Sequence, residues 1–462
     1  MKWTSTDVVR IGNAGESSAP VILWIGVMPE SLSGDDGIVV AHKCRELFEE
    51  HGITDVEVEI RESVVTRMTR SVGPQLLKSA HDSHPTVNVR EPLTVTLGLS
   101  ICARSTPWAE GTGGFFISEG PKSNRLLLVT ARHIVFEPDK ANNKKFERKT
   151  DSQRRHDVIL LGDAAFQRLL ESVQTEIRSK ELTVQHEEER IKLFEVQDDP
   201  ESNKERGKAQ TLLDEAIYGL KAFYQDVSTR WATQESRVLG HIIFSAPIGV
   251  GVGIDQFTED FATIEIDRSK INANNFIGNV VDLRTQIPSS EFTEKMYSHL
   301  QGFKYPADRL LRLRGTIPDN EMRNPSTVDQ NGEKCIMVIK RGSATNLTIG
   351  RANNILSYAR HYFDDDDENP ETSKEWAILP YDKRSGPFSD VGDSGSVIVD
   401  GLGRIGGLLT GGAGLTPITD VTYATPINFL LNRIKAYGFR GANINPVLAA
   451  CPQGREGKKG KD

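Results

Sequence analysis

A serine flanked by glycines constrains this chain more than any other feature, because it needs a fold that presents a hydroxyl on a tight turn. The serine stands in the string Gly392-Asp393-Ser394-Gly395-Ser396, directly before the apolar run Val397-Ile398-Val399. We therefore expect a turn that leads into a buried strand. On such a turn the backbone N–H groups of Gly392 and Ser394 can converge on one point, where a developing oxyanion would be stabilised. The string is a nucleophile signature, with Gly392 and Ser394 as the predicted oxyanion hole.

Two further motifs supply a base and an acid upstream of the serine. The buried-strand pattern Leu126-Leu127-Leu128-Val129 ends in Thr130-Ala131-Arg132-His133, which places His133 at a strand end. Asp260 stands immediately before the alternating segment 261–266. A histidine has the ordinary pKa needed to take the serine proton and return it to a leaving group, and an aspartate can hold the imidazole tautomer. The predicted catalytic residues are His133, Asp260 and Ser394.

Asp157 is the competing acid, because it lies nearer to His133 in the sequence. It opens a predicted strand over 157–161, whereas Asp260 has the context Asp-Phe-Ala-Thr-Ile. We prefer Asp260, and Asp157 stays the alternative.

The order His, Asp, Ser distinguishes between unrelated folds that carry such a set. Two more strings accompany the three motifs, Gly111-Thr112-Gly113-Gly114-Phe115-Phe116-Ile117 and Thr422-Tyr423-Ala424-Thr425-Pro426-Ile427. Together they resemble the trypsin/chymotrypsin-like (PA clan) serine peptidases of the intracellular, disulfide-poor type, over roughly residues 90–435. The resemblance implies a mainly β fold of two six-stranded antiparallel barrels, with the catalytic residues in the groove between them.

The strand-like segments fit that implication. The first set of six lies at 94–102, 114–118, 126–130, 157–161, 238–245 and 261–266. The second set of six lies at 334–340, 347–352, 375–379, 396–399, 405–409 and 422–424, and a helix over 427–437 follows it. In this layout each catalytic residue falls at a strand end or loop.

Two regions stand outside the barrels. Residues 18–63 predict a strand, a helix and a second strand, which form a small N-terminal α/β unit. Residues 164–236 carry apolar side chains three to four apart on both sides of a polar cluster at 198–203. That pattern predicts an antiparallel, coiled-coil helical hairpin inserted in the first barrel, an arm that offers a surface to a protein partner.

The predicted domain boundaries follow from these patterns. They are 1–70 for the N-terminal unit, 90–267 for the first barrel with the 164–236 hairpin, 268–332 for a polar inter-barrel linker, 333–440 for the second barrel and C-terminal helix, and 441–462 for a flexible tail.

Composition argues against several classes of partner. The formal net charge of −8 disfavours nucleic-acid binding, and no segment has the apolar length of a signal peptide or membrane span. Cys44, Cys102, Cys335 and Cys451 are dispersed without a CxxC pair, so we expect free thiols and a cytoplasmic protein. The acidic run 363–369 lacks the alternating ligands and central glycine of a calcium loop, and we expect no metal or cofactor.

The family resemblance also implies where a substrate is held. The residue six before the serine, Phe388, lies at the base of the specificity pocket in that family, with Ser389 beside it. Neither is acidic, so an apolar or small substrate side chain is expected. The stretch Thr410-Gly411-Gly412 resembles the strand that pairs with the substrate backbone, and its glycines leave room for a peptide.

Activation is the point at which the chain departs from secreted relatives. Those are cut to free an N-terminus that pairs with the aspartate before the serine, and no such string precedes Gly111. Asp393 must therefore find another partner, or the oxyanion loop stays unformed until something binds.

The sequence thus predicts a serine endopeptidase that hydrolyses peptide bonds of a protein or peptide substrate through an acyl-enzyme. One alternative is a catalytically weak or inactive scaffold protein of the same fold that acts through its helical arm. An intact His, Asp and Ser set disfavours it. A second alternative is an esterase with the same residues, and the chain order disfavours its common α/β-hydrolase form.

Overall fold

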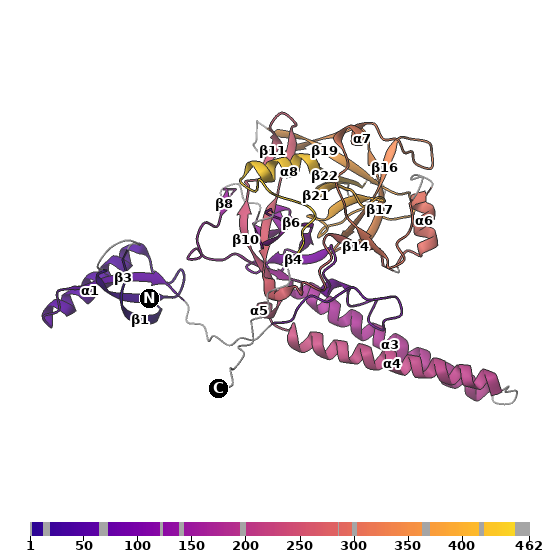
Figure 1. Cartoon of the computed structure of the whole chain (residues 1–462), viewed down its shortest axis with the longest axis horizontal. Coiled ribbons are helices and arrows are strands. Elements are labelled where there is room, and N and C mark those ends of the chain that lie inside the picture. The colour runs from indigo at the N-terminus through magenta and orange to yellow at the C-terminus, as the bar shows by residue number, and fades with distance from the viewer. Residues whose placement is uncertain are drawn as a thin grey trace, which may run out of the picture. The chain divides into compact units, whose positions relative to one another are not determined.

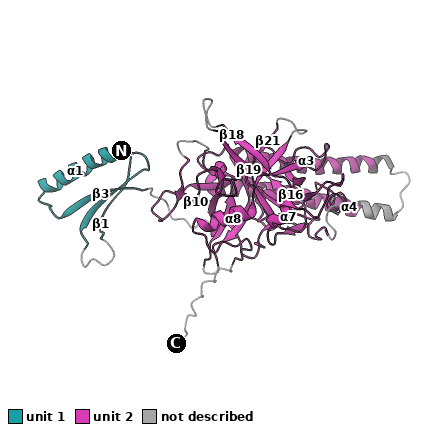
Figure 2. Ribbon diagram, turned by 90° about the horizontal axis from the view of Figure 1, so that it is seen from above, with its two compact units in different colours: residues 1–72 teal, residues 73–462 magenta. Residues whose placement is uncertain are grey.

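The structure is a computed structural model, and it describes residues 2–12, 19–63, 73–120, 123–137, 143–194, 200–284, 286–297, 303–362, 370–414 and 420–448. The chain divides into two compact units, residues 1–72 and 73–462, which Figure 2 colours separately. Each unit is described by itself below.

The first unit is a three-stranded sheet with one helix. Strands β2 (Val21–Val27) and β3 (Val56–Glu62) pair in parallel, connected by helix α1 (Gly34–Glu50). Ser33 caps that helix by accepting a hydrogen bond from the Asp36 N–H, as serine at this position commonly does. The strand–helix–strand pattern predicted from the sequence is present. A further strand, β1 (Trp3–Arg10), pairs antiparallel with β2 and was not predicted.

In the second unit, the first barrel closes through six strands. Its members are β4 (Leu99–Ala103), β5 (Gly111–Gly113) with β6 (Phe115–Ser118), β7 (Leu126–Thr130), β9 (Asp157–Leu160), β10 (Val238–Ser245) and β13 (Ala262–Ile266). β5 and β6 are two halves of one strand interrupted at Gly114, so that β4 pairs with the first half and β7 with the second. The short β8 (Phe146–Glu147) adds to β10.

The second barrel repeats this connectivity. Its strands are β16 (Cys335–Gly342), β17 (Asn346–Asn353), β19 (Glu371–Pro380), β20 (Val397–Asp400), β21 (Ile405–Ala413) and β22 (Val421–Pro426). The third strand of the set, β19, pairs with the sixth, β22, and the fourth, β20, pairs with the first, β16, so the sheet closes as in the first barrel. Further strands β11 (Gly249–Val252), β12 (Phe257–Glu259) and β18 (Ser357–His361) extend it, and helix α8 (Ile427–Ala436) follows it (Figure 1).

The predicted fold class is therefore confirmed. The structure is mainly β, with two antiparallel barrels of chymotrypsin-like connectivity, an inserted helical hairpin and a small N-terminal α/β unit. The two barrels hold one large buried core, in which Phe115, Leu128, Ile339 and Val399 have no exposed surface.

The inserted hairpin consists of α3 (Asp163–Phe194) and α4 (Pro200–Arg230), after which α5 (Gln234–Arg237) leads into β10. The helices lie side by side (Figure 1), and Gln174 Nε2 donates a hydrogen bond to the Tyr224 hydroxyl at 2.7 Å. The sequence predicted a break over 198–203, yet α4 already begins at Pro200. The first turn of a helix tolerates proline, because its missing N–H would have had no partner there.

Buried side chains of the hairpin are confined to its base. The buried set is Ala165, Phe166, Leu169, Val173, Ile177, Leu220 and Val227. No described side chain is buried within residues 178–190 of the first helix or within residues 207–219 of the second. The base of the hairpin therefore belongs to the core of the barrels, whereas the described side chains of 178–190 and 207–219 do not.

The segment 268–332, predicted as a polar linker, contains secondary structure and buried side chains. It holds η3 (Arg268–Lys270), β14 (Val280–Asp282), α6 (Ser289–Tyr297), β15 (Leu310–Arg312) and α7 (Asp319–Arg323). Phe292, Met296 and Ile317 have no exposed surface. Ahead of the first barrel, the segment around η1 (Glu91–Leu93) also packs into the core through Leu76 and Leu93.

The predicted tail begins later than expected. Ser118 and Asn443 exchange backbone hydrogen bonds at 3.0 Å, so the chain just after 441 is tied to the first barrel. Residues 449–462 and the acidic run 363–369 lie outside the described residues.

Cys44, Cys102 and Cys335 are free thiols, and Cys451 lies outside the described residues. Burial raises the pKa of Cys102 to about 12 and that of Cys335 to about 11, which disfavours the reactive thiolate in both. We expect thiol titration of the denatured, unreduced protein to count all four cysteines. A count of two or none would contradict this prediction. In the folded protein, Cys102 and Cys335 should react much more slowly than Cys44.

Candidate active site

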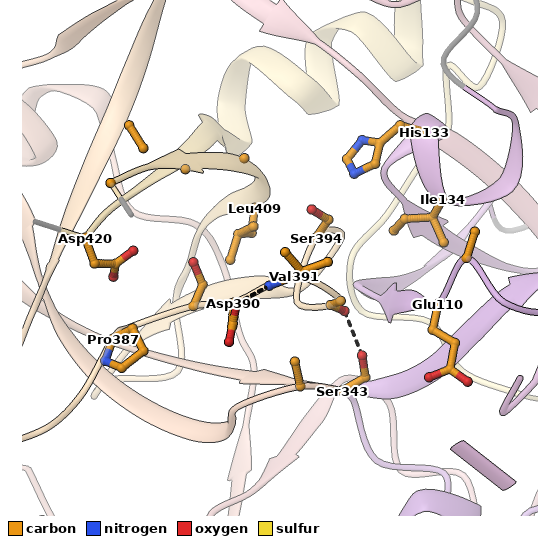
Figure 3. A pocket seen from close by; sticks show the side chains of 18 of the residues that line it. Glu110, His133, Ile134, Ser343, Pro387, Asp390, Val391, Ser394, Leu409 and Asp420 are labelled. Carbon is orange, nitrogen blue, oxygen red and sulfur yellow. Dashed lines mark hydrogen bonds between the residues drawn. The ribbon is translucent and has the colours of Figure 1, made fainter. Parts of the chain in front are cut away.

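A cleft of about 750 Å³ opens where the two barrels meet. Its lining combines residues of the first barrel, among them Glu110 and His133, with residues of the second, among them Ser343, Ser394 and Leu409. His133 and Ser394 lie at the same end of this cleft (Figure 3). Among the described residues, no group of His, Cys, Asp and Glu side chains could hold a metal ion, and no helix has the length and apolar character to cross a membrane.

His133 and Asp260 form a closely bonded pair. His133 lies in the short helix α2 (Arg132–Val135) directly after β7, and Asp260 lies between β12 and β13. Asp260 Oδ2 is 2.6 Å from His133 Nδ1, while Oδ1 accepts the N–H of Arg132 at 2.7 Å and of His133 at 3.3 Å. The Asp260 side chain is 6% exposed and that of His133 is 27% exposed. The buried carboxylate therefore fixes one edge of an imidazole whose other edge remains accessible.

Asp157, the alternative acid, lies elsewhere. It opens β9, opposite His241 of β10, and its carboxylate forms ion pairs with Arg104 and Arg155. The structure thus brings Asp260, and not Asp157, to His133.

The loop that carries Ser394 depends on two glycines for its backbone conformation and is hydrogen-bonded to the first barrel. Gly392 and Gly395 have φ angles of +104° and +82°, which only glycine adopts readily. A Cβ on Gly395 would also lie 2.2 Å from the Thr112 carbonyl oxygen. The Thr112 N–H donates to the Ser394 carbonyl at 2.9 Å. Among the described residues, no hydrogen bond joins the Ser394 hydroxyl to His133, although both side chains line the cleft.

The backbone N–H groups predicted for the oxyanion hole have no acceptor. Neither Gly392 nor Ser394 donates its N–H to any described residue, whereas the Asp393 N–H between them donates to the Asp390 carbonyl at 2.9 Å. Two unpaired donors beside a nucleophile candidate are available to an oxygen that enters the cleft.

Asp393 has the partner that the sequence left open. Its Oδ2 accepts from Lys340 Nζ at 2.8 Å, and both side chains are fully buried. Oδ1 accepts the Ala344 N–H at 2.9 Å, and Thr345 donates its hydroxyl to Oδ2 at 2.6 Å. Burial lowers the pKa of Lys340, and the charge of Asp393 opposes that effect. A lysine of β16 therefore holds the aspartate beside the serine.

The predicted substrate residues are only partly placed in the cleft. Ser389, Gly411 and Gly412 line it, but Thr410 does not. Phe388, predicted at the base of the specificity pocket, is 1% exposed and packs in the core of the second barrel. The described cleft lining does not include Phe388, because its large apolar ring is more stable when it packs with Ile336, Ile378 and Ile398.

Several charged residues of the cleft escaped the sequence analysis. Glu110 forms an ion pair with Arg168 at 2.6 Å, so the base of the helical hairpin contributes to the cleft. Asp390 and Asp420 line the other end. Asp420 directly precedes β22 and is distant from Ser394 in the sequence. A single acidic residue next to a strand carries no sequence signal that would place it in the cleft.

The pKa of His133 predicts how reactivity should depend on pH. Burial lowers this pKa, but the charge of Asp260 and its hydrogen bond outweigh burial, so that the pKa lies above 6.5. Because only neutral imidazole can accept a proton, we expect the rate of Ser394 labelling by a fluorophosphonate to fall as pH drops through a value above 6.5. In Asp260→Asn, this fall in the labelling rate should occur at a lower pH. An acid limb below 6.5 in the unmodified protein would contradict the prediction.

No protein-family model matches the chain, and no curated protein matches it. The solved structures to which it is similar include serine proteases. One is a glutamic acid-specific serine protease with 12% identity and a TM-score of 0.33, for which the match covers 74% of this chain and 97% of that one. Another is Thermobifida fusca Protease A, with 11% identity, a TM-score of 0.30 and coverage of 74% and 95%. A third is Nocardiopsis protease, with 13% identity, a TM-score of 0.30 and coverage of 73% and 95%.

Proposed function

We propose that the chain is a serine endopeptidase in which His133, Asp260 and Ser394 form the catalytic triad. The observation that carries the proposal is the 2.6 Å contact between His133 Nδ1 and Asp260 Oδ2 at a cleft that Ser394 also lines. A buried carboxylate that fixes an imidazole at a cleft also lined by a serine is an arrangement suited to nucleophilic catalysis.

The chemistry proceeds in two halves. Ser394 Oγ attacks the carbonyl carbon of the substrate while His133 Nε2 takes the hydroxyl proton, and the N–H groups of Gly392 and Ser394 bind the developing oxyanion. The C–N bond then breaks, and His133 returns the proton to the leaving amine. Water repeats the sequence on the acyl-enzyme and releases the acid. The reaction needs neither a metal nor a cofactor.

Hydrolysis of a fluorogenic protein substrate by the purified full-length chain tests the proposal. We expect cleavage by the unmodified protein and none by Ser394→Ala. Ser385→Ala is the matched control, because Ser385 is an exposed serine of the same barrel outside the cleft lining. Equal activity of Ser394→Ala and the unmodified protein would overturn the proposal. A folded protein without hydrolysis or Ser394 labelling would favour the scaffold alternative.

The helical hairpin is proposed to recruit a protein partner or large substrate through its distal half. Because the base is buried and Arg168 reaches the cleft, replacement of the whole segment 164–236 would damage the site itself. A short Gly/Ser connection in place of 180–215 removes only the distal half. We expect this variant to react normally with a small fluorophosphonate and to turn over its physiological substrate more slowly. Loss of labelling in a folded variant would contradict a recruiting role.

A further inference from the structure

Two carboxylates in the cleft have no part in the proposed reaction. Asp390 and Asp420 lie on the side of the cleft away from Glu110, near Pro387 and Leu409 (Figure 3). Asp390 belongs to the segment 387–391 and Asp420 to the start of the segment that leads into β22, and both segments line the cleft together with Ser394. A side chain bound between these segments would belong to the residue whose carbonyl faces Ser394.

The negative charge at this end of the cleft is uncompensated. Glu110 is neutralised by Arg168, and His133 is held by Asp260. Within the described part of the chain, by contrast, Asp390 and Asp420 form no ion pair. Asp420 Oδ2 accepts the Phe388 N–H at 3.0 Å, and Asp390 Oδ1 accepts the Val391 N–H at 2.7 Å.

The electrostatics of Asp420 point the same way. Burial is the main cause that raises the pKa of Asp420, and the negative charge of Asp390 raises it further. The hydrogen bond from the Phe388 N–H and the charge of Lys340 act in the opposite direction and do not outweigh them. Lys340 is fully buried and already bonded to Asp393 at 2.8 Å. A cation that entered from the cleft would relieve the repulsion between the two carboxylates and stabilise both.

We propose that Asp420, with Asp390, binds the lysine or arginine side chain of the substrate residue on the acyl side of the cleaved bond. The inference rests on the proposed peptidase function and names its substrate class. It replaces the apolar or small side chain expected from Phe388 and Ser389. An arginine can form a bidentate, charge-assisted contact with such carboxylates, and the acid reaches the pocket from the loop before β22, not from the segment before the serine.

Peptide kinetics test the proposal with substrates that differ only in the residue before the cleaved bond. We expect the unmodified protein to prefer arginine and lysine over citrulline and norleucine by about 100-fold in kcat/KM, since loss of one partner of a buried, bonded charge pair has an effect of that size. Asp420→Asn keeps an acceptor for the Phe388 N–H and should erase this preference. Asp382→Asn is the charge-matched control, because Asp382 lies outside the cleft lining. A preference for norleucine, or one that Asp420→Asn leaves unchanged, would overturn the inference.

A binding experiment separates this inference from the proposed function. In Ser394→Ala, which cannot react, fluorescence titration with p-aminobenzamidine measures cation binding alone. We expect binding that weakens at least tenfold in Ser394→Ala/Asp420→Asn and is unchanged in Ser394→Ala/Asp382→Asn. Such binding in a protein that cleaves no peptide would support the cation site and contradict the peptidase function. Equal binding by all three variants would overturn the cation site, whatever the activity.

Discussion

Replacement of His133 by alanine should lower the rate at which Ser394 reacts with a fluorophosphonate by about 10⁶-fold, because it removes the one imidazole among the described residues that line the cleft. Asp260 is bonded to the far edge of the imidazole and is itself 6% exposed, so it has no route to the hydroxyl. The rate is measured by stopping the labelling reaction at set times and quantifying the adduct on Ser394. His81→Ala serves as control, since His81 is exposed and its imidazole bonds only to Ser83 among the described residues.

A measurement of stability distinguishes a catalytic role of His133 from a purely structural one. Removal of His133 also takes a partner from the buried Asp260 carboxylate, so urea unfolding of the variant must show that the protein is folded under the labelling conditions. A variant that keeps labelling within about tenfold of the unmodified rate would show that another base serves Ser394.

Replacement of Lys340 by methionine should destabilise the protein by about 3–5 kcal/mol and strongly slow labelling of Ser394, because a buried charge that loses its partner is costly. Lys340 and Asp393 both have no exposed surface, and Asp393 is the residue between the two oxyanion-hole donors. Without the ammonium, the carboxylate must take up a proton or leave its site, and either change disturbs the loop. Urea unfolding and labelling measure the two effects.

The double variant Lys340→Met/Asp393→Asn provides the matched comparison. Because it removes both charges, it should recover part of the lost stability. The amide oxygen that replaces the carboxylate could still accept the N–H of Ala344. If Lys340→Met were as stable as the unmodified protein, the buried pair would not be what holds this loop.

The strands of both barrels could be predicted because they are short, apolar and bounded by turn residues. The core segments Leu126–Thr130 and Val397–Asp400 are buried at every position, and both begin with an apolar run of the kind that predicts a buried strand. The same reasoning failed for β1, whose mixed apolar and charged residues become a strand only through pairing with β2. It also failed for 268–332, where scattered apolar residues such as Phe292 are buried by contacts distant in sequence.

The site was predictable where chemistry is encoded in a local string, and not where it depends on long-range pairing. His133, Asp260 and Ser394 each stand in a recognisable motif, and the contact between His133 and Asp260 spans 127 residues. Lys340 lies 53 residues from Asp393, at the end of an apolar strand, where the pattern does not reveal that its ammonium turns inward. Asp420 directly precedes β22, and the pairing of Val421 with Ala413 of β21 places this end of the strand at the cleft.

The most direct measurement for the central claim is the site of covalent modification. The folded, unmodified chain is incubated with a fluorophosphonate, digested, and its adduct located by mass spectrometry. The account predicts one modified residue, Ser394, with no adduct in His133→Ala or when the protein is first unfolded in urea. No adduct on the folded chain, or one on a different serine, would contradict it.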